Sequence, residues 1–239
     1  MINKYCIGVL VFIVLVGFVF PVYGESNLLN SGIAAYQKGN YEDAIEYINN
    51  YRDEVEDDYR AGYYLGLCYI KLERYERAIK YLREARNQKS MDYRVLINLG
   101  RAYYNAGNNE KAEEILNRAR LFENRDEQVY NLLGLINMDR KDFSRSRELF
   151  LQGLELNKNN YYLLNNLGYV YLQQGEYENA LKYLEEAVAR EPEVAFIYNN
   201  LGITHQNLGN LARAVKSFEM ALEINPDYEK AKQNLENLQ

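Results

Sequence analysis

The sequence contains few of the groups on which most enzymes depend. Its 239 residues include one histidine, His205, and two cysteines, Cys6 and Cys68. A zinc site of the usual kind needs about four nitrogen or sulfur ligands, and a nucleophile–histidine–acid triad would have to rely on His205 alone. The glycines are spread along the chain rather than gathered in a phosphate-binding loop. We therefore expect no catalytic residue, no metal and no cofactor.

Proline and tryptophan are also scarce, with three prolines and no tryptophan, whereas tyrosine occurs 24 times. Apolar residues make up 48% of the chain, which is enough for a folded core and argues against disorder. The net charge is −6, and it becomes −7 without residues 1–24, which hold one lysine and no acid. A mildly acidic protein gains nothing from attraction to phosphate, so nucleic acid is not an expected partner.

The first 24 residues have the pattern of an export signal. Residues 7–20 contain no charged side chain, Pro21 ends this stretch, and Gly24 precedes a suitable cleavage point before Glu25. The apolar stretch is shorter than the roughly 20 residues of a membrane-spanning helix, which favours cleavage. We expect an exported protein, periplasmic or associated with the cell envelope. The alternative is an uncleaved segment, residues 5–22, that anchors the chain to the inner membrane and is its only membrane contact.

An internal repeat dominates the rest of the sequence. Six glycines recur every 34 residues without an insertion, at Gly32, Gly66, Gly100, Gly134, Gly168 and Gly202. Five of them follow a leucine, and small residues recur 12 and 19 positions later, as at Ala78 and Ala85. Apolar residues three and four apart, such as Leu164, Leu167 and Tyr171, predict two amphipathic helices per unit. Because one unit cannot bury its own apolar face, neighbouring units must stack.

A period of 34 residues with Leu-Gly, Tyr, Ala and Ala in this order resembles the tetratricopeptide repeat. The resemblance implies an all-α fold, a right-handed α-solenoid of six helix-turn-helix repeats with a capping helix. The repeats would span residues 25–58, 59–92, 93–126, 127–160, 161–194 and 195–228, and the capping helix residues 229–239. It also implies a protein-binding groove lined by the first helix of each repeat.

The helix phase of that family assigns repeat positions 2, 5, 9, 12 and 13 to the groove. The candidate partner-binding residues are Arg60, Tyr63, Lys71, Arg94, Arg101, Tyr104, Asn131, Tyr162, Asn165, Tyr169, Phe196 and Asn199. The cations would hold acidic groups of a partner, unless they are solvated or already paired with acids of the protein. Asn165 and Asn199 would pair with a partner's backbone, and the aromatic residues would clamp its apolar side chains.

A second set of asparagines has a structural interpretation. Asn30, Asn98, Asn166 and Asn200 recur at the same repeat position, and such recurrence favours hydrogen bonds between repeats. The lysine and asparagine of the family members that clamp chaperone C-termini are absent here.

Several other residues have both a structural and a functional interpretation. We expect His205 to be packed and hydrogen-bonded, Cys68 to be a small buried hydrophobe, and the acidic residues of 53–58 to form a solvated turn. The fourth repeat departs most from the pattern, with Asn137, Lys141, Ser146 and Gly153 in place of a tyrosine, a glycine and two alanines, which predicts looser packing and a hinge.

The predicted function is a non-enzymatic interaction scaffold of the cell envelope that binds a peptide or helix, with an acidic partner as one expectation. The alternative is a structural repeat protein that assembles into homo-oligomers.

Overall fold

The computed structural model describes residues 25–89, 92–122, 126–190 and 192–238. The predicted export segment, residues 1–24, lies outside this range. The described residues form thirteen α-helices. Their bounds are α1 Glu25–Gln37, α2 Tyr41–Glu54, α3 Tyr59–Lys71, α4 Tyr75–Gln88, α5 Tyr93–Asn105, α6 Asn109–Arg120, α7 Glu127–Asp139, α8 Phe143–Leu156, α9 Tyr161–Gln173, α10 Tyr177–Val188, α11 Ala195–Asn207, α12 Leu211–Ile224 and α13 Glu229–Glu236.

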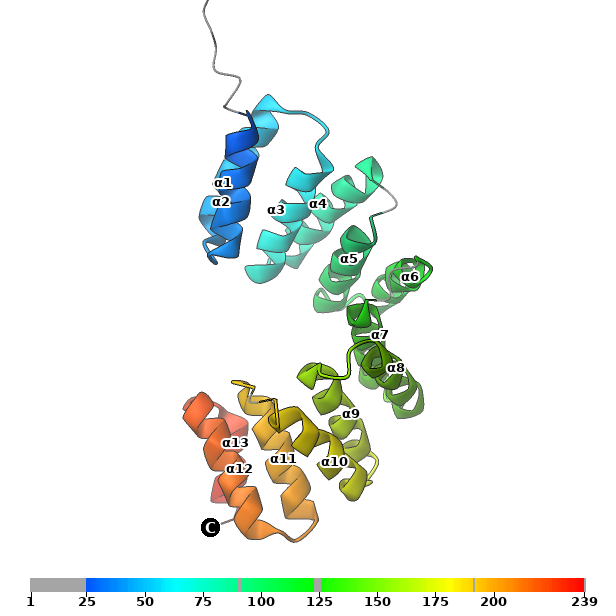
Figure 1. The fold of residues 1–239 in the computed structure, drawn as a ribbon, viewed down its shortest axis with the longest axis vertical. Coiled ribbons are helices and arrows are strands. Elements are labelled where there is room, and N and C mark those ends of the chain that lie inside the picture. The colour runs from blue at the N-terminus through cyan, green and yellow to red at the C-terminus, as the bar shows by residue number, and fades with distance from the viewer. Residues whose placement is uncertain (1–24, 90–91, 123–125, 191, 239) are drawn as a thin grey trace, which may run out of the picture.

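The helices form one curved array of antiparallel pairs (Figure 1). The pair α1 and α2 stands at one end of the curve, and α12 with α13 stands at the other. The odd-numbered helices from α3 to α11 lie on the inner side, while α6 and α8 lie on the outer side. The predicted all-α solenoid is therefore confirmed.

The turn within each repeat reverses the chain through one residue in the left-handed conformation. This residue is Gly39, Gly107, Gly175 or Gly209 in four repeats, with φ between 76° and 84°. In repeats 2 and 4 the same turn is made by Glu73 and Lys141, at φ of 57° and 62°. Backbone hydrogen bonds close the turn in the Schellman pattern, as in Asp142 N to Asn137 O at 2.9 Å. The geometry is thus the same with or without glycine, but a side chain in this region is strained.

The recurring glycine before each turn lies where the two helices of a repeat cross. A Cβ added at Gly134 would stand 2.3 Å from Cε1 of Phe150 on α8, and one added at Gly66 would stand 2.4 Å from Cγ of Leu82 on α4. Both partner side chains are fully buried. The backbones therefore approach closely enough to bury a large side chain directly against a glycine.

The core of the described residues runs along the array as several clusters, and one division between them lies within the fourth repeat. One cluster of buried side chains extends from Leu29 to Leu149, and the next extends from Phe150 to Ile197. At the C-terminal end α13 packs Ala231, which is fully buried, against Ala221 of α12. The other face of α13 is polar, as a helix that ends an open stack must be.

None of the helices in the described ranges is long and apolar enough to cross a membrane.

Candidate functional site

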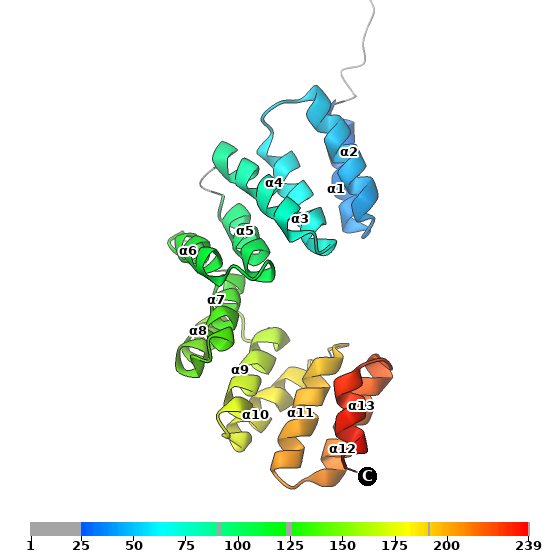
Figure 2. The ribbon, with the colours of Figure 1, turned by 180° about the vertical axis from the view of Figure 1, so that it is seen from behind.

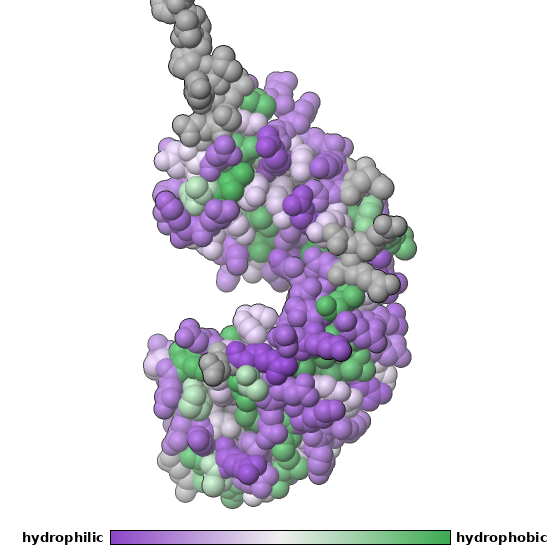
Figure 3. Space-filling view, viewed as in Figure 1, coloured by the Kyte–Doolittle hydropathy of each residue, from purple (hydrophilic) through white to green (hydrophobic). Residues whose placement is uncertain are grey.

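The inner side of the curve is hollowed into a wide groove (Figure 3). The first helices of the repeats form its floor, and their N-terminal ends form one rim. The residues predicted for partner binding come from α3, α5, α7, α9 and α11, which lie along this inner side. The structure thus places the candidate residues on the first helices of successive repeats, and their exposure differs greatly.

The rim of the N-terminal half carries two arginines that already have acidic partners. The Arg60 guanidinium binds the Asp58 carboxylate at 2.6 Å, and that of Arg94 binds Asp92 at 3.1 Å. Each aspartate also accepts the backbone N–H of the arginine two residues later and so caps its helix. Burial alone would raise the pKa of the Asp92 carboxyl, but the hydrogen bonds from Arg94 outweigh it, and the pKa lies below its usual value.

Two further cations lie on the same half of the groove. Arg101 donates to Asn98 Oδ1 at 2.9 Å and to Oε1 of Gln128 on α7, so it joins the third repeat to the fourth. Burial lowers the pKa of Arg101. Lys71, at the end of α3, is exposed. Of the four predicted groove cations, Lys71 is thus the one for which we find no side-chain hydrogen bond or ion pair within the described ranges.

Tyr63 and Tyr104 are half-buried on this surface. Burial raises the pKa of Tyr63 to about 12, and its hydroxyl accepts a hydrogen bond from Asn98 at 3.3 Å. Burial, together with the nearby Asp139 carboxylate, raises the pKa of Tyr104 to about 12. Both hydroxyls therefore stay protonated at neutral pH and can act only as hydrogen-bonding groups.

The asparagines form a ladder that ties repeats together. Asn166 donates to Asn131 at 2.9 Å, Asn200 to Asn165 at 2.9 Å, and Asn234 of the capping helix to Asn199 at 2.9 Å. The predicted inter-repeat hydrogen bonds are confirmed for Asn98, Asn166 and Asn200, whereas Asn30 of the first repeat makes none within the described residues. Asn165 and Asn199 are each only 3% exposed. Their carbonyl oxygens are used within the array and are not offered to a partner.

The C-terminal half of the groove is aromatic. Tyr162 and Phe196 are 44% and 36% exposed at the starts of α9 and α11, with ring centroids 6.4 Å apart. Deeper in the groove, a hollow of about 330 Å³ lies between α9, α11 and the start of α13. Tyr169 and Ile203 line its floor. This hollow is large enough for one or two apolar side chains of a partner.

The other lining residues include some that sequence analysis did not single out. Tyr177, Tyr228 and Lys230 also face the hollow. Lys230 occupies repeat position 2 on α13. The family's helix phase assigns this position to the groove, so extending that assignment to the capping helix would have identified Lys230. Tyr177 begins a second helix, which that rule leaves out.

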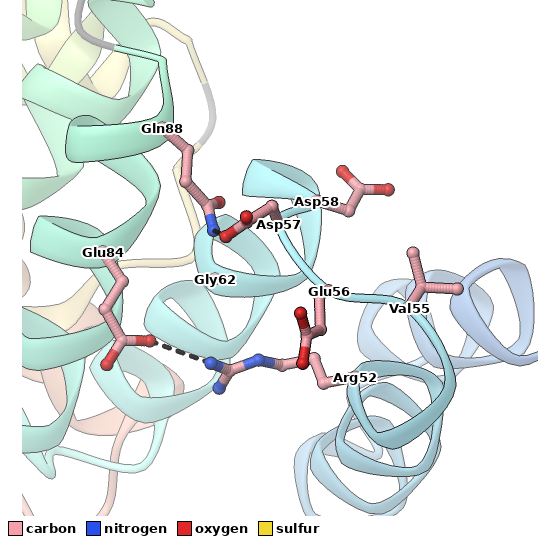
Figure 4. Close-up of a pocket in the computed structure, with 8 residues that line it drawn as sticks. All are labelled: Arg52, Val55, Glu56, Asp57, Asp58, Gly62, Glu84 and Gln88. Atoms are coloured by element: carbon pink, nitrogen blue, oxygen red, sulfur yellow. Dashed lines mark hydrogen bonds and ion pairs between the residues drawn. The ribbon is translucent and has the colours of Figure 1, made fainter.

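A smaller polar pocket lies between the first and second repeats (Figure 4). Its volume is about 200 Å³, and its lining is mostly charged. Arg52 binds Glu84 across it at 3.0 Å, and Gln88 donates to Asp57 at 3.2 Å. These contacts link the second and fourth helices and account for the pocket as a repeat junction. The predicted solvated turn needs one correction, since Asp53 and Glu54 belong to the last turn of α2.

The two residues with reactive side chains are both buried. The thiol of Cys68 is fully buried, and burial raises its pKa to about 12, so a thiolate is suppressed at neutral pH. His205 is 4% exposed, and burial lowers its pKa. Its packed position is as expected, but its Nδ1 lacks the predicted hydrogen bond among the described residues. Within those residues there is also no group of three or more metal-ligating side chains.

The stacked helix pairs, left-handed turns and open inner groove define a tetratricopeptide-repeat solenoid. The family model for the C-terminal domain of cilia and flagella-associated protein 70 matches residues 20–238, and the chain belongs to this tetratricopeptide-repeat family. No curated protein matches the chain.

Among solved structures, a chain of the APC/C hetero-tetramer Cut9–Hcn1 is similar with a TM-score of 0.81 and 18% identity, over 90% of this chain and 42% of that one. This chain thus spans less than half the length of that neighbour. PilW, described as a widely conserved type IV pilus biogenesis factor, has a TM-score of 0.78 and 14% identity, over 88% of this chain and 98% of its own. PilF of Pseudomonas aeruginosa has a TM-score of 0.75 and 19% identity, over 90% and 97%. At these identities the likeness shows the fold alone.

Proposed function

We propose that the chain is a non-enzymatic interaction scaffold of the cell envelope, which binds an extended or helical segment of a partner protein in its concave groove. The observation that carries this proposal is the hollow between α9, α11 and the start of α13, which is lined by three tyrosines together with amide side chains. The rings of Tyr162 and Phe196, at the starts of α9 and α11, are also exposed. Aromatic side chains around a concave site are typical anchors of protein interfaces, and the amide side chains of this hollow add hydrogen-bonding groups.

The groove also limits the chemistry of the partner. Arg60 and Arg94 are each paired with their own capping aspartate, which offsets their charge and weakens their attraction for an acidic group of a partner. Lys230 stands at the edge of the hollow and is exposed. We infer a partner segment that places an apolar side chain against Tyr169 and Ile203 and an acidic group near Lys230.

The envelope assignment rests on two supports. The first is the apolar pattern of residues 7–20, which is typical of an export signal. The second is the structural likeness to a protein described as a type IV pilus biogenesis factor. We do not extend that protein's role to this chain, but an exported scaffold that helps to assemble envelope machinery agrees with both.

Site-specific cross-linking tests the groove directly. A photoreactive residue at position 203, inside the hollow, is compared with one at position 211, because Leu211 is 53% exposed on α12 and does not line the hollow. We expect an adduct with one partner from position 203, identified by mass spectrometry, that is lost when Tyr169→Ala is added. Equal adducts from both positions, or an adduct unaffected by Tyr169→Ala, would remove the groove as the binding site.

A further inference from the structure

The two N-terminal repeats carry opposite charges. Residues 25–58 hold nine acidic and two basic side chains, whereas residues 59–92 hold eight basic and four acidic ones. Their second helices, α2 and α4, are neighbours along the array (Figure 2) and are bridged by side chains without backbone contact. Ion pairs between Arg52 and Glu84 at 3.0 Å and between Arg74 and Glu42 at 3.8 Å join these two helices. An acidic helix and a basic helix thus form one surface away from the groove.

The opposite charges occupy equivalent positions of the repeat. Asp43 on α2 corresponds to Arg77 on α4, and Glu46 corresponds to Lys80, each 34 residues apart. All four side chains are exposed. Arg77 and Lys80 lie over tyrosine rings of their own repeat, at 5.6 and 5.2 Å, which leaves their charges open to solvent. In the described part of the chain none of the four takes part in an ion pair.

We propose that this surface, the α2–α4 face formed by Asp43, Glu46, Arg77 and Lys80, binds a second copy of the chain. A two-fold axis that runs along the helices, between α2 and α4, places α2 of one copy over α4 of the other. Because α2 and α4 run in the same direction and these residues hold equivalent positions, this arrangement brings Asp43 toward the other copy's Arg77 and Glu46 toward its Lys80. The symmetry repeats both contacts, so the face is complementary to itself.

The expected association is weak and depends on salt. Each exposed ion pair contributes little, and salt screens it. Tyr47, which is 42% exposed beside Glu46 on α2, adds apolar area at the same place. The face uses the outer helices of the first two repeats, so each copy keeps an open groove, and this inference does not rest on the proposed function.

Charge exchange between two variants tests the proposal. One variant carries Arg77→Glu and Lys80→Glu, and the other carries Asp43→Lys and Glu46→Lys. Sedimentation velocity is measured for the full chain, expressed with its own N-terminal segment so that processing is the same throughout, at about 20 mM and about 500 mM salt. We expect the native chain at low salt to approach twice its monomer mass as its concentration rises, and to be monomeric at high salt. Each variant alone should stay monomeric, while an equal mixture of the two should form a one-to-one dimer.

The control reverses the same charges at the same repeat positions elsewhere. Arg213 and Lys216 on α12 are equivalent to Arg77 and Lys80 and are also exposed. Arg213→Glu with Lys216→Glu should leave the association unchanged, and circular dichroism should show the same helix content in all variants. A native chain whose mass does not depend on concentration at low salt would overturn the proposal. So would variants that associate as the native chain does, or a mixture that fails to form the dimer.

Discussion

The amide of Asn200 donates to the side-chain oxygen of Asn165 at 2.9 Å and so joins the sixth repeat to the fifth. Asn165 is 3% exposed, and Asn200 is half-buried. Between the third and fourth repeats the same two positions hold Ile97 and Leu132, which are 3% and 5% exposed and belong to one core cluster. The array thus contains a polar and an apolar version of one inter-repeat contact.

Because the array contains both the polar and the apolar form of this contact, the outcome of a double-mutant cycle at Asn165 and Asn200 can be predicted. Asn165→Ile alone leaves the half-buried amide donor of Asn200 without its partner, and we expect it to destabilise the fold by about 1–3 kcal/mol. Adding Asn200→Leu recreates the native apolar version and should recover most of that loss. Urea unfolding measures the free energy of unfolding of the native chain and of the three variants. If the double variant loses as much stability as the sum of the losses of the two single variants, the site does not accept the apolar pair.

The turns of repeats 2 and 4 predict stabilising substitutions. Lys141 has φ of 62° in the left-handed region, where glycine is unstrained. We expect Lys141→Gly to stabilise the fold by up to about 1 kcal/mol, since relief of strain exceeds the added entropy of the unfolded chain. The reverse change, Gly39→Ala, should destabilise by a similar amount, because the site has open space but a φ of 84°. Opposite shifts of the thermal midpoint would support this account, and shifts of the same sign would contradict it.

Two glycines of the fourth repeat should respond differently to alanine. A Cβ at Gly134 would meet the ring of Phe150 at 2.3 Å, whereas one at Gly153 would meet the flexible end of Leu163 at 2.9 Å. Gly134→Ala should therefore destabilise by about 1–3 kcal/mol through overpacking. Gly153→Ala gains about 1 kcal/mol of helix propensity, which offsets the repacking of Leu163. Denaturant midpoints rank the two, and a larger loss for Gly153→Ala would refute the ranking.

His205 predicts a pH dependence of stability. Burial lowers its pKa from the ordinary value of 6.5, nearby Arg213 lowers it further, and Glu185 opposes them. The unfolded chain therefore binds a proton more readily, and stability should fall as the pH drops below about 6.5, until the folded pKa is passed. His205→Asn removes this proton, and the equivalent Asn137 is already a buried residue that donates to Leu133 O at 2.8 Å. The difference in unfolding free energy between the two proteins should change from pH 7.5 to pH 5.5, and a constant difference would exclude His205 as its source.

The hinge predicted in the fourth repeat coincides with one of the divisions of the core. One cluster of buried side chains ends at Leu149 and the next begins at Phe150, both on α8. We propose the fourth repeat as a hinge, in which α7 and α8 exchange their amide hydrogens faster than α5 and α9. Hydrogen exchange followed by mass spectrometry measures this. Uniform protection from α5 to α9 would leave the hinge without support.

The sequence by itself determined the architecture. A strict period of 34 residues fixes where helices start, cross and turn, because every unit must bury the same stripe against its neighbour. Even the left-handed turns at Glu73 and Lys141 follow from the period, since the equivalent residues of the other repeats are glycines. The recurrence of Asn166 and Asn200 likewise predicted hydrogen bonds between repeats.

Only the tertiary structure decided which groove residues are available to a partner. Helix phase places Asn165, Arg94 and Tyr162 on the same side, yet Asn165 is buried in the ladder, Arg94 is paired with its capping Asp92, and Tyr162 remains 44% exposed. Exposure depends on what the adjacent repeat and the helix cap bring against each side chain, and those contacts are set by stacking. Tyr228 and Lys230 likewise join the lining of the hollow only because α13 packs at the end of the array.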